Sequence, residues 1–339
     1  MQLGGKDQPV QEWSLLDWGY QYAAAAAYGL RPKRIKDFVP SLRAAIAHRI
    51  MPEEFKHAVP DGLSALPPDG FAGVCPDLSV NTLMAGYHAG LYQTSHAGPY
   101  KWWAPEERMV LFMDKLKLEK NLRRKLRQGK YKITFDTAFN TVVASCAGPR
   151  EQRRIQLTWI TPPVQEAFER LHAAGHAHSV EVWDENGTLA GGLFGVGYGH
   201  VFATESQFAI QRDASKIAFS VLNRHLQSWG YVANDLRRWT PHLEKFGGAT
   251  IPHGTFRSIV SHFGSSPARA EDWAVNPDLC TGNWEADKER GWAEEDVMDA
   301  LVMAEELRAE HSASVFFEHR GAANATDAAT DSEPIREAS

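Results

Sequence analysis

The chain has 339 residues, of which 43% are hydrophobic and 23% charged, as is ordinary for a soluble globular protein. This length is enough for two domains with their own cores. Three scattered cysteines exclude a disulfide framework and a cysteine-rich zinc site. The chain has no apolar run of membrane-spanning length and no signal-peptide pattern at its start. The sequence therefore predicts a cytoplasmic protein without a membrane partner.

The charge is unevenly distributed. The formal net charge is −6, but residues 285–339 contain 15 acidic and 5 basic residues, so that residues 1–284 carry +4. An acidic tail thus masks a mildly basic body. Because local patches decide binding more than the total does, the net charge does not exclude a nucleic-acid partner.

The N-terminal third gives few functional signals. An alanine-rich segment and a helix over 41–50 are expected in residues 1–50, with no sign of chemistry. The Pro/Gly/Asp-rich residues 60–76 predict loops, residues 81–92 a short helix and residues 109–112 a strand. Trp102 and Trp103 leave two interpretations open, because adjacent tryptophans either stack on bases or fill a core.

Residues 115–132 form the only dense basic run, with nine basic residues that face only Glu119 and the preceding Asp114. Leu118, Leu122 and Leu126 recur at helical spacing and give the predicted helix an inner edge. Four basic side chains then project as a ridge that could neutralise phosphates, namely Lys120, Arg123, Arg124 and Arg127. The alternative is an ordinary solvated helix face.

Residues 158–235 contain most of the candidate chemistry. Thr161 and Pro162 predict the start of a helix, and Gly175 its end. Two strands follow around the hairpin signal Asn186-Gly187, and a third is expected over 201–206. Asp213 is expected to cap a helix that ends at Gly230, and residues 231–234 predict one more strand. This order predicts an α+β layer, with a mostly antiparallel sheet flanked by helices.

Three tempting motifs in this stretch are discounted. The glycine-rich residues 191–199 lack the Lys-Ser/Thr of a phosphate-binding loop, and a bent hairpin strand or the close approach of a ligand is expected instead. His172, His176 and His178 suggest a metal, but no Asp, Glu or Cys is expected to complete a set, so none is predicted. No pyrophosphate loop for an acyl-CoA substrate is found.

Glu205 and Asp235 are the strongest candidates for a site. Each is expected at the end of an apolar strand, where a carboxylate is costly unless it is paired or functional. Such a group can orient an attacking amine or accept its proton. A structural ion pair with Arg or Lys is the alternative.

These residues resemble the leucyl/phenylalanyl-tRNA–protein transferase family over about residues 52–260. The resemblance is carried by segments in the family's order, namely WWAPEERMVLF, LEKNLRRKLR, TAFNTVVASCAGPR, TWI, HAHSVEVW, GGLFGV, DASK and HLEKFGGATIP, with Glu205 and Asp235 between them. HAHSVEVW and DASK together are specific. No counterpart is recognised for the first 50 or the last 80 residues or so.

The resemblance implies a fold and a division into domains. It implies a small N-terminal α/β domain over 51–112 and a GNAT-like aminoacyltransferase domain over 113–260. An N-terminal extension (1–50), an acidic extension with one helix (261–320), in which Val297 and Leu301 are in phase, and a disordered tail (321–339) complete the expected organisation.

The implied activity is transfer of an amino acid from aminoacyl-tRNA to an acceptor amine such as a protein N-terminus, in a monomer without cofactor or metal. The resemblance gives Asp235, Glu205 and the residue at Arg237 catalytic roles and places the acceptor stem of the tRNA on the basic ridge. The expected pocket for the aminoacyl group and terminal adenosine consists of Trp159, Leu193, Phe194, Phe202, Gln207 and Phe208.

Three departures from the family pattern fall on this implied site. Asp-Cys-Gln is Asp235-Leu236-Arg237 here, and an arginine cannot accept the proton that the family's glutamine is thought to receive. Gln207 replaces a methionine, and Gln93-Thr94 replaces Pro-Trp. These changes predict a more polar donor amino acid and an acceptor that bears an acidic group or is a small molecule or peptide. A non-catalytic aminoacyl-tRNA-binding protein is the alternative.

Overall fold

The computed structural model describes most of the chain between residues 10 and 303. The described residues are 10, 12–31, 43, 46, 47, 49–51, 58–60, 62, 70–149, 155–265, 273–282 and 292–303. The chain forms two compact units, residues 1–294 and 295–339. Residues 294–303 are helical, as predicted for the acidic extension, whereas the predicted tail over 321–339 lies outside the described residues. Within the described part, no helix is both long and apolar enough to cross a membrane.

A three-stranded antiparallel sheet is built from the N-terminal third. Its strands are β1 (Phe71–Val74), β2 (Tyr92–Gln93) and β3 (Lys101–Trp103), in the order β1-β3-β2. β1 lies in a segment that the sequence predicted as loops. The helix α4 (Val80–His88) ends before the predicted residue 92, because Gly90 turns the chain with a φ of 75°.

The larger sheet has seven strands in the order β10-β4-β9-β8-β7-β6-β5. Every neighbouring pair is antiparallel except β8 and β9, which are parallel. The strands are β4 (Glu107–Phe112), β5 (Lys132–Phe135), β6 (Ala177–Trp183), β7 (Leu189–Tyr198), β8 (Val201–Ala209), β9 (Ala233–Arg237) and β10 (Ala249–Pro252). β4 thus pairs with strands that are much later in the chain, although the predicted boundary at residue 112 placed it in the N-terminal domain.

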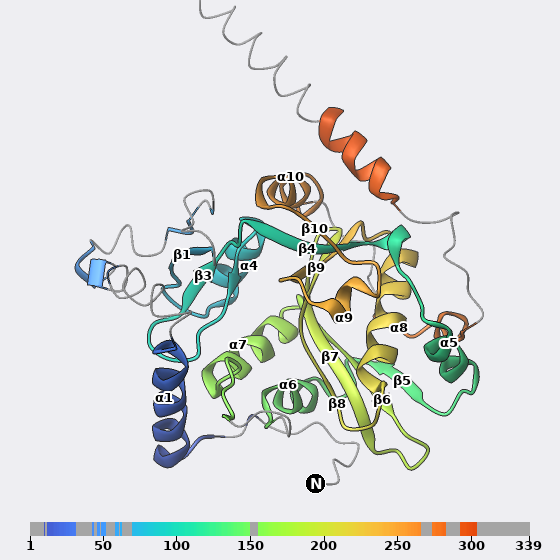
Figure 1. The fold of residues 1–339 in the computed structure, drawn as a ribbon, viewed down its shortest axis with the longest axis horizontal. Coiled ribbons are helices and arrows are strands. Elements are labelled where there is room, and N and C mark those ends of the chain that lie inside the picture. The colour runs from blue at the N-terminus through green and yellow to red at the C-terminus, as the bar shows by residue number, and fades with distance from the viewer. Residues whose placement is uncertain are drawn as a thin grey trace, which may run out of the picture. The chain divides into compact units, whose positions relative to one another are not determined.

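Helices cover both faces of the larger sheet (Figure 1). α8 (Ala214–Ser228) packs on one face against β6, β7 and β8, while α6 (Phe139–Ala147) and α7 (Pro162–Ala173) pack on the other. The remaining helices are α1 (Leu15–Gly29), α5 (Lys120–Arg127), α9 (Pro241–Glu244) and α10 (His253–Phe263), with short 3-10 turns at Met113–Lys115 and Pro277–Cys280. The prediction of an α+β protein with a mostly antiparallel sheet flanked by helices is confirmed.

Two predicted helix caps differ from their expected geometry. Thr161 and Asp213 occupy the N-cap positions of α7 and α8, but neither side chain makes a capping hydrogen bond. Asp213 instead adopts a left-handed φ of 71°, and its carboxylate accepts hydrogen bonds from Lys125 (2.7 Å) and Lys216 (3.0 Å). The Lys125 salt bridge ties α8 to α5, a long-range contact that local sequence patterns do not reveal.

The glycine-rich segment is strand β7, and close packing within the protein explains its composition. A Cβ at Gly191 would lie 2.7 Å from the Ala214 Cβ, and one at Gly195 would lie 2.4 Å from the Phe202 ring. The glycines therefore let β8 and α8 approach the strand backbone. The segment is a hairpin strand, as one of the two predictions had it, and the close neighbours at these glycines are atoms of the protein itself.

Candidate functional site

Two β-bulges place the candidate site residues. In the pairing of β7 with β8, Phe194 lies opposite Ser206 and Gly195 opposite Thr204, so Glu205 is the extra residue of a bulge. In the pairing of β4 with β9, Leu236 is the extra residue between Asp235 and Arg237. Bulges redirect side chains and are frequent beside active sites. Neither Glu205 nor Asp235 ends a strand as predicted, because pairing continues beyond each bulge.

Asp235 is held by a buried arginine of β4. Arg108 Nε and Nη2 donate to the two carboxylate oxygens at 2.8 and 2.6 Å, and the exposed fractions of the Arg108 and Asp235 side chains are 1% and 0%. Asp235 also accepts a hydrogen bond from the Arg237 backbone N–H at 2.8 Å. Arg108 was not predicted as a site residue, because the sequence separates it from Asp235 by 127 positions.

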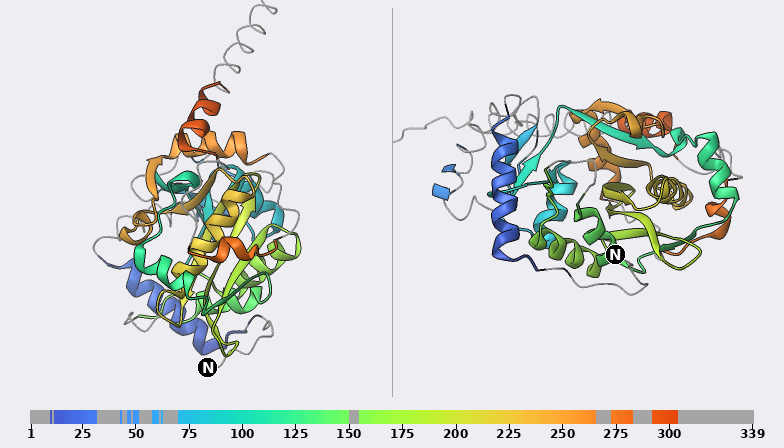
Figure 2. Two further views of the ribbon diagram at one scale, coloured as in Figure 1. Left: turned by 90° about the vertical axis from the view of Figure 1, so that its right-hand side faces the viewer. Right: turned by 60° about the horizontal axis from the view of Figure 1, so that its bottom comes forward.

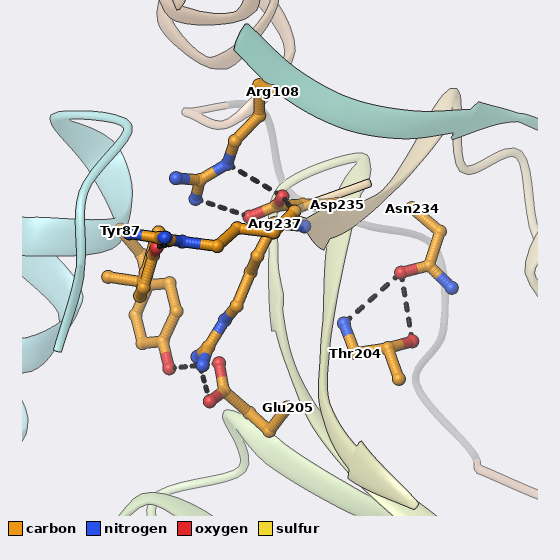
Figure 3. A network of polar contacts seen from close by, with 9 residues as sticks. Tyr87, Arg108, Thr204, Glu205, Asn234, Asp235 and Arg237 are labelled. Atoms are coloured by element: carbon orange, nitrogen blue, oxygen red, sulfur yellow. Dashed lines mark hydrogen bonds and ion pairs between the residues drawn. The ribbon is translucent and has the colours of Figure 1, made fainter. Parts of the chain in front are cut away.

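Arg237 reaches back from this turn to Glu205 (Figure 3). Its backbone is left-handed, with a φ of 65°, and its Nη2 donates to Glu205 Oε2. The other carboxylate oxygen of Glu205 accepts a 2.7 Å hydrogen bond from the hydroxyl of Tyr87 in α4. Burial raises the pKa of Tyr87 and lowers that of Arg237. Both oxygens of Glu205 are therefore engaged by side chains of the protein.

Aromatic rings surround the Arg237 guanidinium. Its carbon lies 4.7 Å from the centroid of the Tyr92 ring and 5.3 Å from that of Trp159. The Arg108 guanidinium also lies 4.6 Å from the Tyr92 ring. Such cation–π contacts stabilise a buried charge. Tyr92 and Tyr87 were missed by the sequence analysis, since a lone tyrosine gives no signal until the fold brings it to the site.

Arg237 and Glu205 line a cavity of about 1350 Å³. Its wall also includes Trp159, Trp103 and several residues of α1, a helix in which the sequence showed no sign of chemistry. α1 is attached by Gln21, whose amide nitrogen lies 2.7 Å from the His96 carbonyl and 2.6 Å from the Thr158 carbonyl. Figure 2 shows α1 from two further directions.

Of the predicted aminoacyl pocket, only Trp159 lines this cavity. Leu193 and Phe202 belong to the core under α8 and are fully buried. Phe194 packs edge-on against Phe139 and Phe168 on the opposite face, and Phe208 packs on a small cluster with Ala138, Trp183 and Leu189. The Oε1 atom of Gln207 is buried without a partner in the described chain. The structure thus places these five residues in the sheet layers, because strand side chains alternate between its faces.

Trp102 and Trp103, for which the sequence left base stacking and core packing open, have different environments. Trp102 is 1% exposed and packs against Gly86, where a Cβ would lie 2.3 Å from its ring. Trp103 lines the cavity and donates from its ring nitrogen to the Thr94 carbonyl at 2.8 Å. One residue of the pair is therefore core, and the other is part of the cavity wall.

The predicted basic ridge lies on α5. Lys120, Arg124 and Arg127 are exposed and Arg123 is half-buried, while Leu122 and Leu126 face the core. Arg127 Nε donates to the Gly282 carbonyl at 3.3 Å. Among the described residues, no carboxylate pairs with any of the four, whereas Lys125 pairs with Asp213. α5 lies at the far end of its unit from α1 (Figure 1).

The prediction that no carboxylate accompanies the histidines is wrong, because Asp136 lies beside His172 and His178. The potential ligand atoms are engaged in the protein's own hydrogen bonds. His178 Nδ1 lies 2.7 Å from Asp136 Oδ2, Ser179 N–H donates to Asp136 Oδ1 at 2.7 Å, and His172 Nδ1 lies 2.8 Å from the Ala177 carbonyl. Trp273 stacks on the His178 ring at 3.7 Å. The Nδ1 atoms of both histidines and the two Asp136 oxygens thus have partners within the described chain.

The chain is similar to a set of bacterial enzymes. The model of the family "Leucyl/phenylalanyl-tRNA protein transferase" matches residues 110–261. The leucyl/phenylalanyl-tRNA–protein transferase of Stutzerimonas stutzeri (strain A1501) is 42% identical over 207 residues, which are 61% of this chain and 90% of that protein. The enzyme of the same name from Chromohalobacter salexigens is 38% identical over 239 residues, 70% of this chain and 90% of that protein.

A comparison with solved structures gives a weaker likeness. The structure of L-PGS from Bacillus licheniformis matches with a TM-score of 0.27 and 12% identity, over 47% of this chain and 53% of that chain. This similarity is too low to support an argument about fold or function.

Proposed function

The chain belongs to the leucyl/phenylalanyl-tRNA–protein transferase family, and on this basis we propose that it transfers an amino acid from aminoacyl-tRNA to an acceptor amine. The observation that carries the proposal is the extent of the match. The aligned region covers 90% of the Stutzerimonas stutzeri enzyme, and the residues that the family model matches, 110–261, include Glu205, Asp235 and Arg237. We further propose that the seven-stranded sheet, including β4, and the helices on its two faces form a GNAT-like fold, which the mixed strand pairing supports.

The proposed reaction is aminolysis of an ester. The acceptor amine attacks the carbonyl carbon of the aminoacyl ester, a C–N bond forms, and the C–O bond to the terminal ribose breaks. One proton leaves the amine and one is taken up by the departing ribose oxygen. The ester is already activated, so no cofactor, metal or nucleotide is required. The enzyme's contribution is to hold the two reactants together and to stabilise developing charge.

Asp235 acts as a positioning residue in this proposal. Its side chain is fully buried, and it does not line the cavity. It accepts hydrogen bonds from Arg108 and from the Arg237 backbone, and it thereby fixes the turn that directs Arg237 to the cavity. Arg237 lines the cavity and has only donors, so it can bind a negatively charged group of a substrate but cannot accept the amine proton.

The second candidate function is binding of aminoacyl-tRNA without transfer, and one observation on Glu205 favours it. Both Glu205 oxygens accept hydrogen bonds from Tyr87 and Arg237 and the side chain is 0% exposed, so no exposed Glu205 oxygen is available to take the amine proton. In a transferase, that proton would pass to water or to the departing ribose oxygen.

The donor side of the proposal rests on charge and on Trp159. The α5 ridge of Lys120, Arg123, Arg124 and Arg127 is suited to phosphates of the tRNA. α5 lies away from α1 and its cavity wall (Figure 1), so the ridge would contact nucleotides distant from the reacting 3′ end. Trp159 in the cavity wall offers a surface for the terminal adenosine or the amino acid. The cavity wall does not contain Gln207, and the expectation of a polar donor therefore receives no support from the structure.

The decisive test is a transfer assay without ATP and with EDTA. Bulk tRNA charged with mixed radiolabelled amino acids is the donor, and peptides with different first residues and a small-metabolite extract are acceptors. Labelled amide product supports the transferase, and identification of the label names the donor. Retained tRNA binding without transfer to any acceptor supports the binding protein.

We place the reaction in the cytoplasm, where aminoacyl-tRNA is made. A monomer suffices, because one chain supplies every residue of the site.

A further inference from the structure

The carboxylate of Glu205 is not available to a cationic substrate. Its side chain is 0% exposed, and its two oxygens accept from the Tyr87 hydroxyl and the Arg237 guanidinium. A carboxylate recognises an ammonium or guanidinium group only through oxygens that can accept from it. Here one positive charge of the protein itself already neutralises Glu205.

The same guanidinium occupies the aromatic setting that would otherwise hold a substrate cation. It lies within 5.3 Å of both the Tyr92 and Trp159 ring centroids. A second cation entering here would lose the ring faces and would meet a like charge at close range. The site therefore disfavours a basic side chain at the position that Arg237 fills.

The charges around the cavity favour an anion instead. Among the described residues, the cavity-lining cations are Lys101, Arg237 and Arg238, and the cavity-lining carboxylates are Asp17 and Glu205. Asp17 is engaged in the capping box of α1 with Ser14, and Glu205 with Tyr87 and Arg237. Both carboxylates thus have partners within the protein.

Arg237 retains capacity for a second carboxylate. A guanidinium has five N–H donors and can bridge two anions. Nη2 donates to Glu205, whereas the buried Nε has no partner in the described part of the chain. Arg238 lies beside it, fixed by a 2.9 Å hydrogen bond from its Nε to the Tyr92 hydroxyl.

We propose that the acceptor is a polypeptide whose first residue is acidic, Asp or Glu, and that Arg237 selects it by binding the side-chain carboxylate. This inference rests on the proposed function. The acceptor's α-amine remains the nucleophile, and its side chain supplies the carboxylate that Arg237 binds.

The test compares three peptides that differ only at the first residue, which is Glu, Gln or Arg. Glu and Gln have nearly the same shape, so their ratio isolates the effect of charge. Each peptide is assayed with the full-length wild type, with Arg237→Gln and with the control Arg212→Gln, whose side chain is 94% exposed and outside the cavity. Bulk charged tRNA is the donor, and kcat/KM for transfer is measured for each peptide at two salt concentrations.

The wild type and the control are expected to use the Glu peptide at least tenfold better than the Gln or the Arg peptide, and more so at low salt. Arg237→Gln is expected to lose this preference, mainly through a higher KM for the Glu peptide. If the wild type uses the Arg peptide as well as or better than the Glu peptide, the proposal of an acidic acceptor is overturned, while the proposed transferase function stands. An unchanged Glu-to-Gln ratio in Arg237→Gln overturns that proposal as well. Absence of transfer to all three peptides and to the metabolite extract, with aminoacyl-tRNA still bound, overturns the proposed function and the inference with it.

Discussion

Arg108 and Asp235 form a bidentate ion pair that joins β4 to β9 and is closed to solvent, with N–O distances of 2.8 and 2.6 Å. Removal of one partner from such a pair leaves an uncompensated buried charge. We expect Asp235→Ala to lower the free energy of unfolding by roughly 3–5 kcal/mol. Urea denaturation measures this loss, and the exposed Asp278→Ala serves as the control.

This expectation changes how Asp235 variants should be interpreted. Loss of transfer in Asp235→Ala would follow from a damaged fold as well as from a damaged site. Asp235→Asn keeps an acceptor for the Arg237 N–H and is the better variant for kinetics. A stability of Asp235→Ala within about 1 kcal/mol of the wild type would show that the buried pair matters little, against the usual cost of breaking one.

The Glu205–Arg237 pair predicts strong non-additivity. Glu205→Gln leaves the Arg237 cation without its carboxylate, and Arg237→Gln leaves Glu205 with only Tyr87. Replacing both by glutamine removes both charges together. We expect the double variant to be more stable than the sum of the single effects predicts, by about 1–3 kcal/mol. Denaturation of the four proteins at pH 7 gives the coupling energy, and additive effects would contradict the ion pair.

The basic helix offers a matched pair of residues for a test of tRNA binding. Arg124 is exposed, while its neighbour Lys125 is held by Asp213 at 2.7 Å. Each phosphate contact contributes a slope of about 0.7–0.9 to the dependence of log K on log salt. Arg124→Gln is expected to reduce the slope by that amount, and Lys125→Gln to leave it nearly unchanged. Titrations of tRNA binding over 50–200 mM salt measure the slope of log K against log salt for each variant. Equal slopes in both variants would exclude Arg124 as a phosphate contact.

His253 predicts a stability change at mildly acidic pH. Burial, with Arg108 and Arg257 nearby, lowers its pKa from 6.5 to about 4. The neutral form is therefore favoured in the folded state, and the contribution of His253 to stability is complete above pH 6.5 and is lost as the pH falls towards 4. The unfolding free energy of His253→Phe should decline less over this range than that of the wild type. His225, whose pKa burial also lowers, leaves a residual slope.

A control from the same helix makes the pH experiment specific. His262 is exposed, so His262→Phe removes an imidazole that burial does not constrain. Urea denaturation of the three proteins between pH 4 and 7.5 gives the profiles. A His253→Phe profile parallel to that of the wild type would refute the role of His253.

The sequence predicted the elements better than the site, for physical reasons. Helices such as α7 and α8 carry periodic apolar residues and start and stop signals, which are local. The bulges at Glu205 and Leu236 depend on pairing with distant strands and have no local signal. Arg108 directly precedes the strand predicted over 109–112, and its partner was evident only once β4 lay beside β9. The role of α1 in lining the cavity was likewise not predicted, because it depends on contacts between segments that are distant in the sequence.

The position of β4 between β9 and β10 constrains how the protein is made. During translation, β4 leaves the ribosome more than a hundred residues before either neighbour, since β9 begins at Ala233 and β10 at Ala249. Until then both edges of β4 lack their partners, and Arg108 has no carboxylate to neutralise it. An apolar strand with free edges is prone to associate with other chains. Incomplete chains that stop before β9 are thus expected to aggregate or to need a chaperone, whatever their N-terminal part has already folded into.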